Sequence, residues 1–177
     1  MAIKEEIKKS SELRFDGRLI QVTFDVAEVN GKDAWREVVH HPGASAVIAI
    51  VDKGRIVMER QYRYALGRTL LEIPAGKLDG DEDPLVCAQR ELAEETGYHA
   101  EEWHSLGTIA TSPGFCNEMI HLYIAKGLTK GQTHWDPDEY VELEYYTLTD
   151  LMDAIRQEEI KDSKTLAAIA LALPYLS

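Results

Sequence analysis

The sequence predicts an α/β protein, in which helices pack on both sides of a mixed β-sheet to form an α/β/α sandwich. Two observations carry this prediction. Segments typical of strands recur along the chain as far as residue 147, and segments with helical periodicity lie in its middle and at its end. In addition, no internal repeat, low-complexity tract or linker divides the chain. We therefore expect an N-terminal extension with a hairpin at residues 1–42, followed by one domain at residues 43–177.

The strands are predicted from local patterns of apolar residues. Residues 19–29 alternate, and Asn30-Gly31 is a strong hairpin signal, so the chain should return along residues 34–40. Residues 45–51 form a continuous apolar run, which is typical of a buried strand. The remaining strands of the mixed sheet are expected at residues 55–63, 70–73, 103–110, 119–125 and 141–147.

Three helices are expected, and the first has the clearest signals. Pro84 suits a first helical turn, where its missing N–H costs nothing, and Gly97 suits the end of the same helix. Between them, four residues at helical spacing give the helix a face to bury. These positions are Leu85, Ala88, Leu92 and Thr96. Thr149 and Ser163 are the expected N-caps of two later helices.

Composition excludes several classes of partner. The net charge of −12 disfavours nucleic acid and anionic membranes, and no apolar run approaches the roughly twenty residues of a membrane helix. The first ten residues are charged and lack the apolar core of a secretory signal, so we expect a cytoplasmic protein. Cys87 and Cys116 are too few for a disulfide framework.

Acidic side chains cluster on the first predicted helix. Glu91 and Glu95 lie four residues apart, so their side chains are neighbours on one face of the helix. Glu94 lies next to them around the helix axis. Stacked carboxylates repel each other, and hard oxygen ligands so placed suit Mg²⁺ or Mn²⁺ held together with substrate phosphates. Taken alone, however, three clustered glutamates favour an ordinary acidic helix face on which Arg90 pairs with its neighbours.

Residues 76–98 read GKLDGDEDPLVCAQRELAEETGY, and this stretch resembles the Nudix box at every fixed position. The matching residues are Gly76, Glu82, Arg90, Glu91, Glu94, Glu95 and Gly97. Tyr98 stands where an aliphatic residue is commoner. With the full pattern present, the acidic cluster is interpreted as a metal site rather than as a solvated surface.

A second signature lies sixteen residues beyond Gly97, at Pro113. The sequence around Pro113, TSPGF, resembles the proline-containing loop of ADP-ribose pyrophosphatases within the Nudix superfamily. Stretches such as LEIPAG before the box are also similar, and the resemblance runs from about residue 15 to residue 148. These flanking matches are shared with hydrolases of other nucleoside diphosphate sugars, including GDP-mannose.

The resemblance implies roles for individual residues. The Ala75 carbonyl with the carboxylates of Glu91 and Glu95 would bind Mg²⁺, with Mn²⁺ as a possible substitute, and Arg90 with Glu94 would support the site. Other residues match substrate-binding positions. These are Trp35, Arg36, Arg63, Leu78, Ser112, Pro113 and Gly114. Without the resemblance, Trp35 would be read as a packing aromatic and the two arginines as solvated surface residues.

The catalytic base is expected in an acidic loop at residues 134–139. Pro137 stands where related enzymes often carry the base, and it has no carboxylate. Glu139 is therefore the first candidate, and Glu118, just past the proline loop, is the second.

The implied function is Mg²⁺-dependent hydrolysis of ADP-ribose to AMP and ribose 5-phosphate. A broader nucleoside diphosphate sugar hydrolase, acting on GDP-mannose or ADP-glucose, is the alternative. A nucleotide-sugar sensor without turnover is a second alternative, and the presence of every box acid argues against it. The resemblance also implies a homodimer that exchanges its N-terminal antiparallel strands and shares its active sites.

Overall fold

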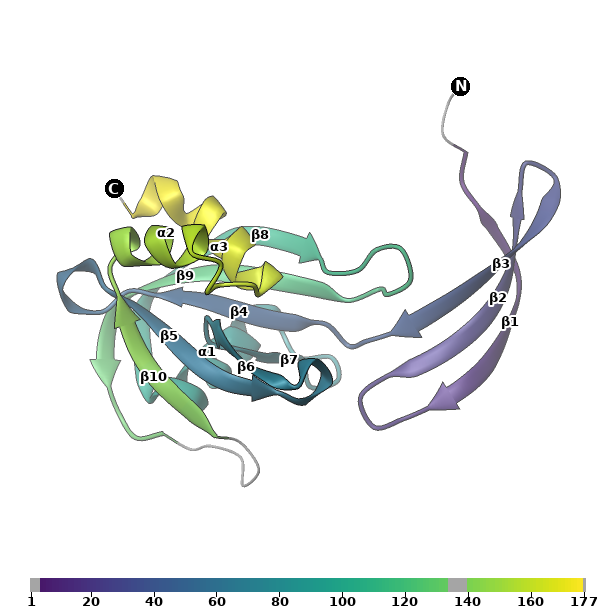
Figure 1. Ribbon diagram of the computed structural model, residues 1–177. Helices are drawn as coiled ribbons and strands as arrows, with labels where there is room; N and C mark the ends of the chain where they lie inside the picture. Colours follow the sequence, from purple (N-terminus) through teal and green to yellow (C-terminus); the bar gives the residue numbers. More distant parts are fainter. Residues whose placement is uncertain (1–3, 134–139, 177) are drawn as a thin grey trace. The chain divides into compact units, whose positions relative to one another are not determined.

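The computed structural model describes residues 4–133 and 140–176 (Figure 1). The chain divides into two compact units, one of Met1–Gly43 with Ala110–Met119 and the other of Ala44–Ile109 with Ile120–Ser177. The first unit therefore contains the proline loop, which the sequence-based division at residue 43 assigns to the main domain. Among the described residues, none of the helices combines the length and apolarity that a membrane span requires.

The first unit contains a three-stranded antiparallel sheet in the order β1-β2-β3. Its strands are β1 (Ile7–Asp16), β2 (Gln21–Val29) and β3 (Lys32–His40). Asn30 and Gly31 turn the chain between β2 and β3 with φ values of 54° and 76°, so the predicted hairpin is confirmed. Strand β1 was not expected, because its residues are all exposed and carry no burial periodicity.

The proline loop packs against β3 within this unit. The backbone N–H of Val39 donates to the carbonyl of Phe115 at 2.7 Å, and the N–H of Asn117 donates to the carbonyl of Val39 at 3.1 Å. The loop is thereby fixed as an extra edge segment beside β3.

The second unit contains two sheets, in the orders β7-β4-β9-β8 and β10-β5-β6. Strand β4 runs parallel to β9 and antiparallel to β7, so the prediction of a mixed sheet is confirmed for the four-stranded sheet. The separate three-stranded sheet is antiparallel. The strands are β4 (Ala44–Ala49), β5 (Ile56–Arg63), β6 (Arg68–Glu72), β7 (Ala75–Lys77), β8 (Tyr98–Ala110), β9 (Met119–Lys130) and β10 (Val141–Tyr146).

Helices cover both faces of β4, as Figure 1 shows for α1 against α2 and α3. Every residue of β4 is buried, which agrees with its continuous apolar run. Val47 lies in one core cluster with Leu92 of α1, and its neighbour Ile48 lies in the other with Leu151 of α2 and Ile169 of α3. Successive β4 side chains thus pack on opposite sides, and the predicted α/β/α arrangement is confirmed.

The three α-helices are α1 (Pro84–Thr96), α2 (Leu148–Arg156) and α3 (Ser163–Ala172). Short 3₁₀ turns occur at Asp52–Gly54, Tyr64–Leu66 and Leu173–Tyr175. For α1, Pro84 and Gly97 mark the two ends as expected, and Gly97 has a φ of 69°. The Asp83 side chain accepts the N–H groups of Leu85 and Val86, an N-cap that contributes about 1 kcal/mol.

The predicted N-caps of the later helices were wrong by one or two residues. Thr147, rather than Thr149, caps α2 through a capping box with Asp150. Asp162, rather than Ser163, caps α3 by accepting the N–H of Thr165. In both cases a second good capping residue precedes the one that the pattern favoured, so the helix begins earlier.

Candidate active site

The candidate site is built around β7, the short strand just before the box helix. Ala75 and Gly76 pair with Ala46 and Ser45 of the buried strand β4, which fixes the β7 backbone. The N–H of Ala75 donates to Oε2 of Glu95 at 3.0 Å. The structure therefore brings together Ala75 and Glu95, two of the three expected metal ligands.

Gly76 provides space for the third ligand, Glu91. A Cβ atom at position 76 would overlap the carboxylate of Glu91. Gly76 is therefore required at this point for close approach rather than for an unusual backbone angle. Because Glu91 lies against β7 and Glu95 bonds the neighbouring amide, both carboxylates face the same short strand.

Cys87 joins the helix to the same strand. Its thiol is buried and lies within hydrogen-bonding distance of the carbonyls of Gly76, at 3.6 Å, and Lys77, at 3.4 Å. Burial raises the pKa of Cys87 to about 12, so the group remains a thiol and a donor at neutral pH. This contact helps to hold α1 on β7.

Arg90 connects the remaining acids of the box. It forms a two-point contact with Glu82, at 3.0 and 2.8 Å, and donates to Glu91 at 2.7 Å and to Glu94 at 3.1 Å. The hydrogen bonds from Arg90 lower the pKa of Glu82 to about 2. One guanidinium thus contacts three carboxylates, offsets part of their charge and helps to hold Glu91 in place.

The residues gathered here fit a hard divalent cation. Glu95 is only 3% exposed and Glu91 is half-buried, so their charges lie close together in a partly desolvated place. Within residues 4–133 and 140–176, no three His, Cys, Asp or Glu side chains form a complete metal cluster. Mg²⁺ does not require one, because it binds through one or two carboxylates with waters and substrate phosphates.

Arg63 lies at the end of β5 in a charged network that the sequence did not predict. Its Nε and Nη2 atoms donate to the two carboxylate oxygens of Glu72 at 2.8 and 2.7 Å. Lys164 of α3 also donates to Glu72. Hydrogen bonding to Glu72 raises the pKa of Arg63, and the negative charge of Glu95 adds to this effect. Arg63 therefore interacts electrostatically with a carboxylate of the Nudix box.

Glu72 and Lys164 are functional candidates that sequence reasoning missed. Both are buried, with 2% and 7% of their surface exposed. The sequence gives one signal for them, because Glu72 is a lone acid inside the apolar stretch LLEIP. A charged residue is almost never buried unless it is paired, so this position indicates a buried ion pair.

Two predicted substrate residues, Trp35 and Arg36, lie on β3 in the first unit. Trp35 is 63% exposed and stacks on Phe24 at 5.1 Å between ring centroids. Arg36 donates to both carboxylate oxygens of Glu6 at 2.9 and 2.7 Å. The exposed indole is available to a planar ligand, and the guanidinium already holds an anion in the geometry that a phosphate would require.

Ser112, Pro113 and Gly114 form a tight turn in the same unit. The Ser112 carbonyl accepts the N–H groups of Phe115 and Cys116, at 3.1 and 2.9 Å. Glu118 follows this turn. Its carboxylate accepts the Thr111 hydroxyl at 2.7 Å and lies 3.3 Å from Nδ1 of His41.

The remaining predicted residues are less informative. Leu78 directly follows β7 and is half-buried. Glu139, the first candidate for the base, belongs to residues 134–139 and lies outside the described residues.

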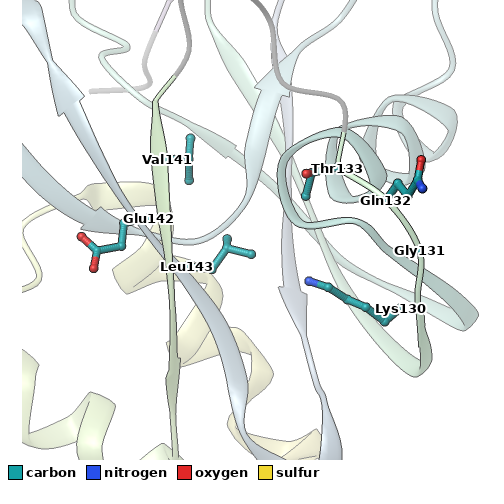
Figure 2. A pocket seen from close by; sticks show the side chains of 7 residues that line it. All are labelled: Lys130, Gly131, Gln132, Thr133, Val141, Glu142 and Leu143. Carbon is teal, nitrogen blue, oxygen red and sulfur yellow. The ribbon is translucent and has the colours of Figure 1, made fainter.

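A pocket of about 730 Å³ lies between the end of β9 and the start of β10 (Figure 2). Its lining residues are Lys130, Gly131, Gln132, Thr133, Val141, Glu142 and Leu143. Lys130 donates to the carbonyl of Thr96 at 2.7 Å, so one wall is attached to the end of the box helix. None of the described residues that line this pocket is a predicted site residue, and we assign the chemistry to the box instead.

A glycine, an arginine and four glutamates are arranged around one strand and one helix in the pattern of the Nudix box. Residues 39–169 match the NUDIX domain, and the chain belongs to this family.

Three similar proteins extend the comparison. A methanol dehydrogenase activator from Bacillus methanolicus is 48% identical over 168 residues, which cover 93% of this chain and 91% of that protein. An ADP-ribose pyrophosphatase from Bacillus subtilis (strain 168) is 42% identical over 168 residues, with the same two shares. The crystal structure of an ADP compounds hydrolase has a TM-score of 0.87 at 21% identity and covers 99% of this chain and 96% of that one. The Nudix-type fold expected from the sequence is confirmed.

Proposed function

We propose that this protein hydrolyses the diphosphate bond of ADP-ribose and releases AMP and ribose 5-phosphate. The observation that carries the proposal is the complete box, in which Glu91 and Glu95 lie against the Ala75-Gly76 strand. The 42% identical ADP-ribose pyrophosphatase, which this chain covers almost fully, supports the choice of substrate. The TSPGF loop, which resembles that of such enzymes, supports it as well.

We assign the metal site to Glu91, Glu95 and the Ala75 carbonyl, with Mg²⁺ as the expected ion and Mn²⁺ as a substitute. When bound, the cation would polarise the diphosphate and lower the pKa of a water molecule. Arg90 holds Glu91 in position and offsets part of the charge of Glu82 and Glu94.

The diphosphate and the attacking water need further groups. We assign Arg63 to the diphosphate, because a planar guanidinium near Glu95 can bind phosphate oxygens through two hydrogen bonds. Leu78, Ser112, Pro113 and Gly114 are proposed to contact the rest of the substrate. Glu139 is the first candidate for the base that accepts the water proton, and Glu118 is the second.

Substrate preference provides the direct test. We expect a higher kcat/KM with ADP-ribose than with GDP-mannose, UDP-glucose or NADH, measured with purified protein, Mg²⁺ and a coupled phosphatase. A preference for GDP-mannose would instead support the alternative function, a broader nucleoside diphosphate sugar hydrolase. Tight binding of ADP-ribose without any released phosphate would instead indicate a sensor.

We also propose that residues 1–42 mediate a homodimer with shared sites, in which Trp35 and Arg36 of one subunit reach the nucleotide bound by the other. Mixing inactive Glu95→Gln subunits with inactive Arg36→Ala subunits should then restore activity in a fraction of the hybrids. Light scattering at micromolar concentration should give the mass of a dimer. A monomer, or no recovery of activity after subunit exchange, would exclude the shared site.

A second candidate function follows from the 48% identical relative, which is named as an activator of methanol dehydrogenase. This name concerns an effect on another enzyme and is compatible with hydrolysis. Methanol dehydrogenase turnover, measured with and without this protein and Mg²⁺, would show whether such activation occurs.

A further inference from the structure

The charged network behind Arg63 links the proposed site to helix α3. Glu72 shares its carboxylate between Arg63, which contacts both oxygens, and Lys164, which contacts Oε2. Lys164 in turn lies 3.1 Å from Oδ2 of Asp162, the N-cap of α3. Glu72 and Lys164 are buried, whereas 38% of the Arg63 side chain is exposed.

The network is anchored to the backbone that leads into β7. The N–H of Ile73, the residue after Glu72, donates to the Thr165 hydroxyl at 3.0 Å, and this hydroxyl donates to Asp162 at 2.6 Å. The start of α3 is thereby joined to the segment that carries Ala75. A displacement of Lys164 would therefore change the position of both Arg63 and this segment.

The charges show what Lys164 adds. A single buried carboxylate paired with Arg63 would cancel the guanidinium charge that a diphosphate needs. Lys164 supplies a second positive charge to Glu72. It also pairs with Asp162 at 3.1 Å, and the same Asp162 oxygen accepts the N–H of Thr165 at 2.9 Å. Counted together with Asp162, the two cations and the two carboxylates balance, whereas without Lys164 the group would be net negative. The exposed member of this group is Arg63.

We propose that Lys164 is a positioning residue for the hydrolytic reaction. By offsetting the charge of Glu72, Lys164 leaves the positive charge of Arg63 available to the substrate diphosphate. This proposal rests on the proposed function of Arg63. It assigns to α3, which lies outside the Nudix box, a part in diphosphate binding.

The test compares Lys164→Met, which removes the charge and keeps the length of the side chain, with Lys164→Arg, which keeps the charge. Lys161→Met is the matched control, since Lys161 is exposed and forms a surface pair with Glu158 at 3.5 Å. The readouts are KM and kcat with ADP-ribose and, independently of turnover, the Kd of ADP by calorimetry. Arg63→Ala and the double variant Arg63→Ala/Lys164→Met complete the cycle.

Lys164→Met should raise KM and the Kd of ADP roughly 5- to 50-fold, with a smaller change in kcat. Lys164→Arg should restore most of the loss, and Lys161→Met should match the wild type. In the double variant, the effect should be no larger than in Arg63→Ala alone, because both changes remove the same interaction. If Lys164→Met does not fold, Lys164→Gln, which can still donate to Glu72, should show the same rise.

Several outcomes would overturn the proposal. Unchanged KM and Kd in folded Lys164→Met, or losses that simply add in the double variant, would leave Lys164 with a structural role only. A strong effect of Arg63→Ala without one of Lys164→Met would refute the role of Lys164 and leave the proposed function intact. No effect of Arg63→Ala would refute the diphosphate role of Arg63 and this inference with it. Absence of ADP-ribose turnover by the wild type would refute the proposed function, and the calorimetric Kd of ADP would then decide the role of Lys164.

Discussion

Glu95→Gln and Glu91→Gln should each reduce kcat by roughly a hundredfold or more while the protein stays folded. Both changes preserve the size of the side chain and remove one charge from the place where the cation is proposed to bind. Glu95 is buried and accepts the Ala75 amide, and the amide oxygen of Gln can still accept that hydrogen bond. The loss should therefore fall on metal binding and turnover rather than on packing.

Steady-state kinetics over a range of Mg²⁺ concentrations, together with thermal unfolding, would measure this effect. Glu159→Gln is the matched control, because it removes one charge from an exposed acid after α2. Near-wild-type rates in both box variants would end the metal-hydrolase account. An equal loss in the control would show that net charge, and not the site, is responsible.

Gly76→Ala should also reduce kcat about a hundredfold, since displacements near 1 Å in an active site can cost that much. The added Cβ would occupy the position of the Glu91 carboxylate, which would have to move and break its contact with Arg90. Because this carboxylate is a proposed metal ligand, its shift should disturb the site more than the fold.

A double variant checks this mechanism. Gly76→Ala should cost little further activity in a Glu91→Ala background, because the carboxylate that it displaces is already missing. The measurement is kcat/KM for the two single variants and for the double variant. Losses that multiply would show that Gly76 acts through something other than Glu91.

The main elements of the fold were predictable because their signals are local. The continuous apolar run at residues 45–51 predicted a buried strand, and Pro84 with Gly97 marked the ends of the box helix. Strand β1 was missed, because a strand that is exposed along its whole length shows no burial pattern.

The candidate site was predictable only in part. The proximity of Ala75 and Glu95, and the space that Gly76 leaves for Glu91, follow the spacing of the box. The contact between Glu72 and Lys164 joins residues 92 positions apart, and no periodicity encodes such a pair. Arg63 was predicted as a substrate residue. Its ion pair with Glu72 depends on the pairing of β5 with β6 and was visible only in the structure.

The central claim is that this chain splits the diphosphate of ADP-ribose through the Nudix box. Mass spectrometry of the products formed from ADP-ribose and Mg²⁺ tests it most directly, with wild type and Glu95→Gln run in parallel. The account predicts equal amounts of AMP and ribose 5-phosphate from the wild type, and almost none from the variant. Intact ADP-ribose after prolonged incubation with the wild type, or the same products formed by the variant at an equal initial rate, would contradict it.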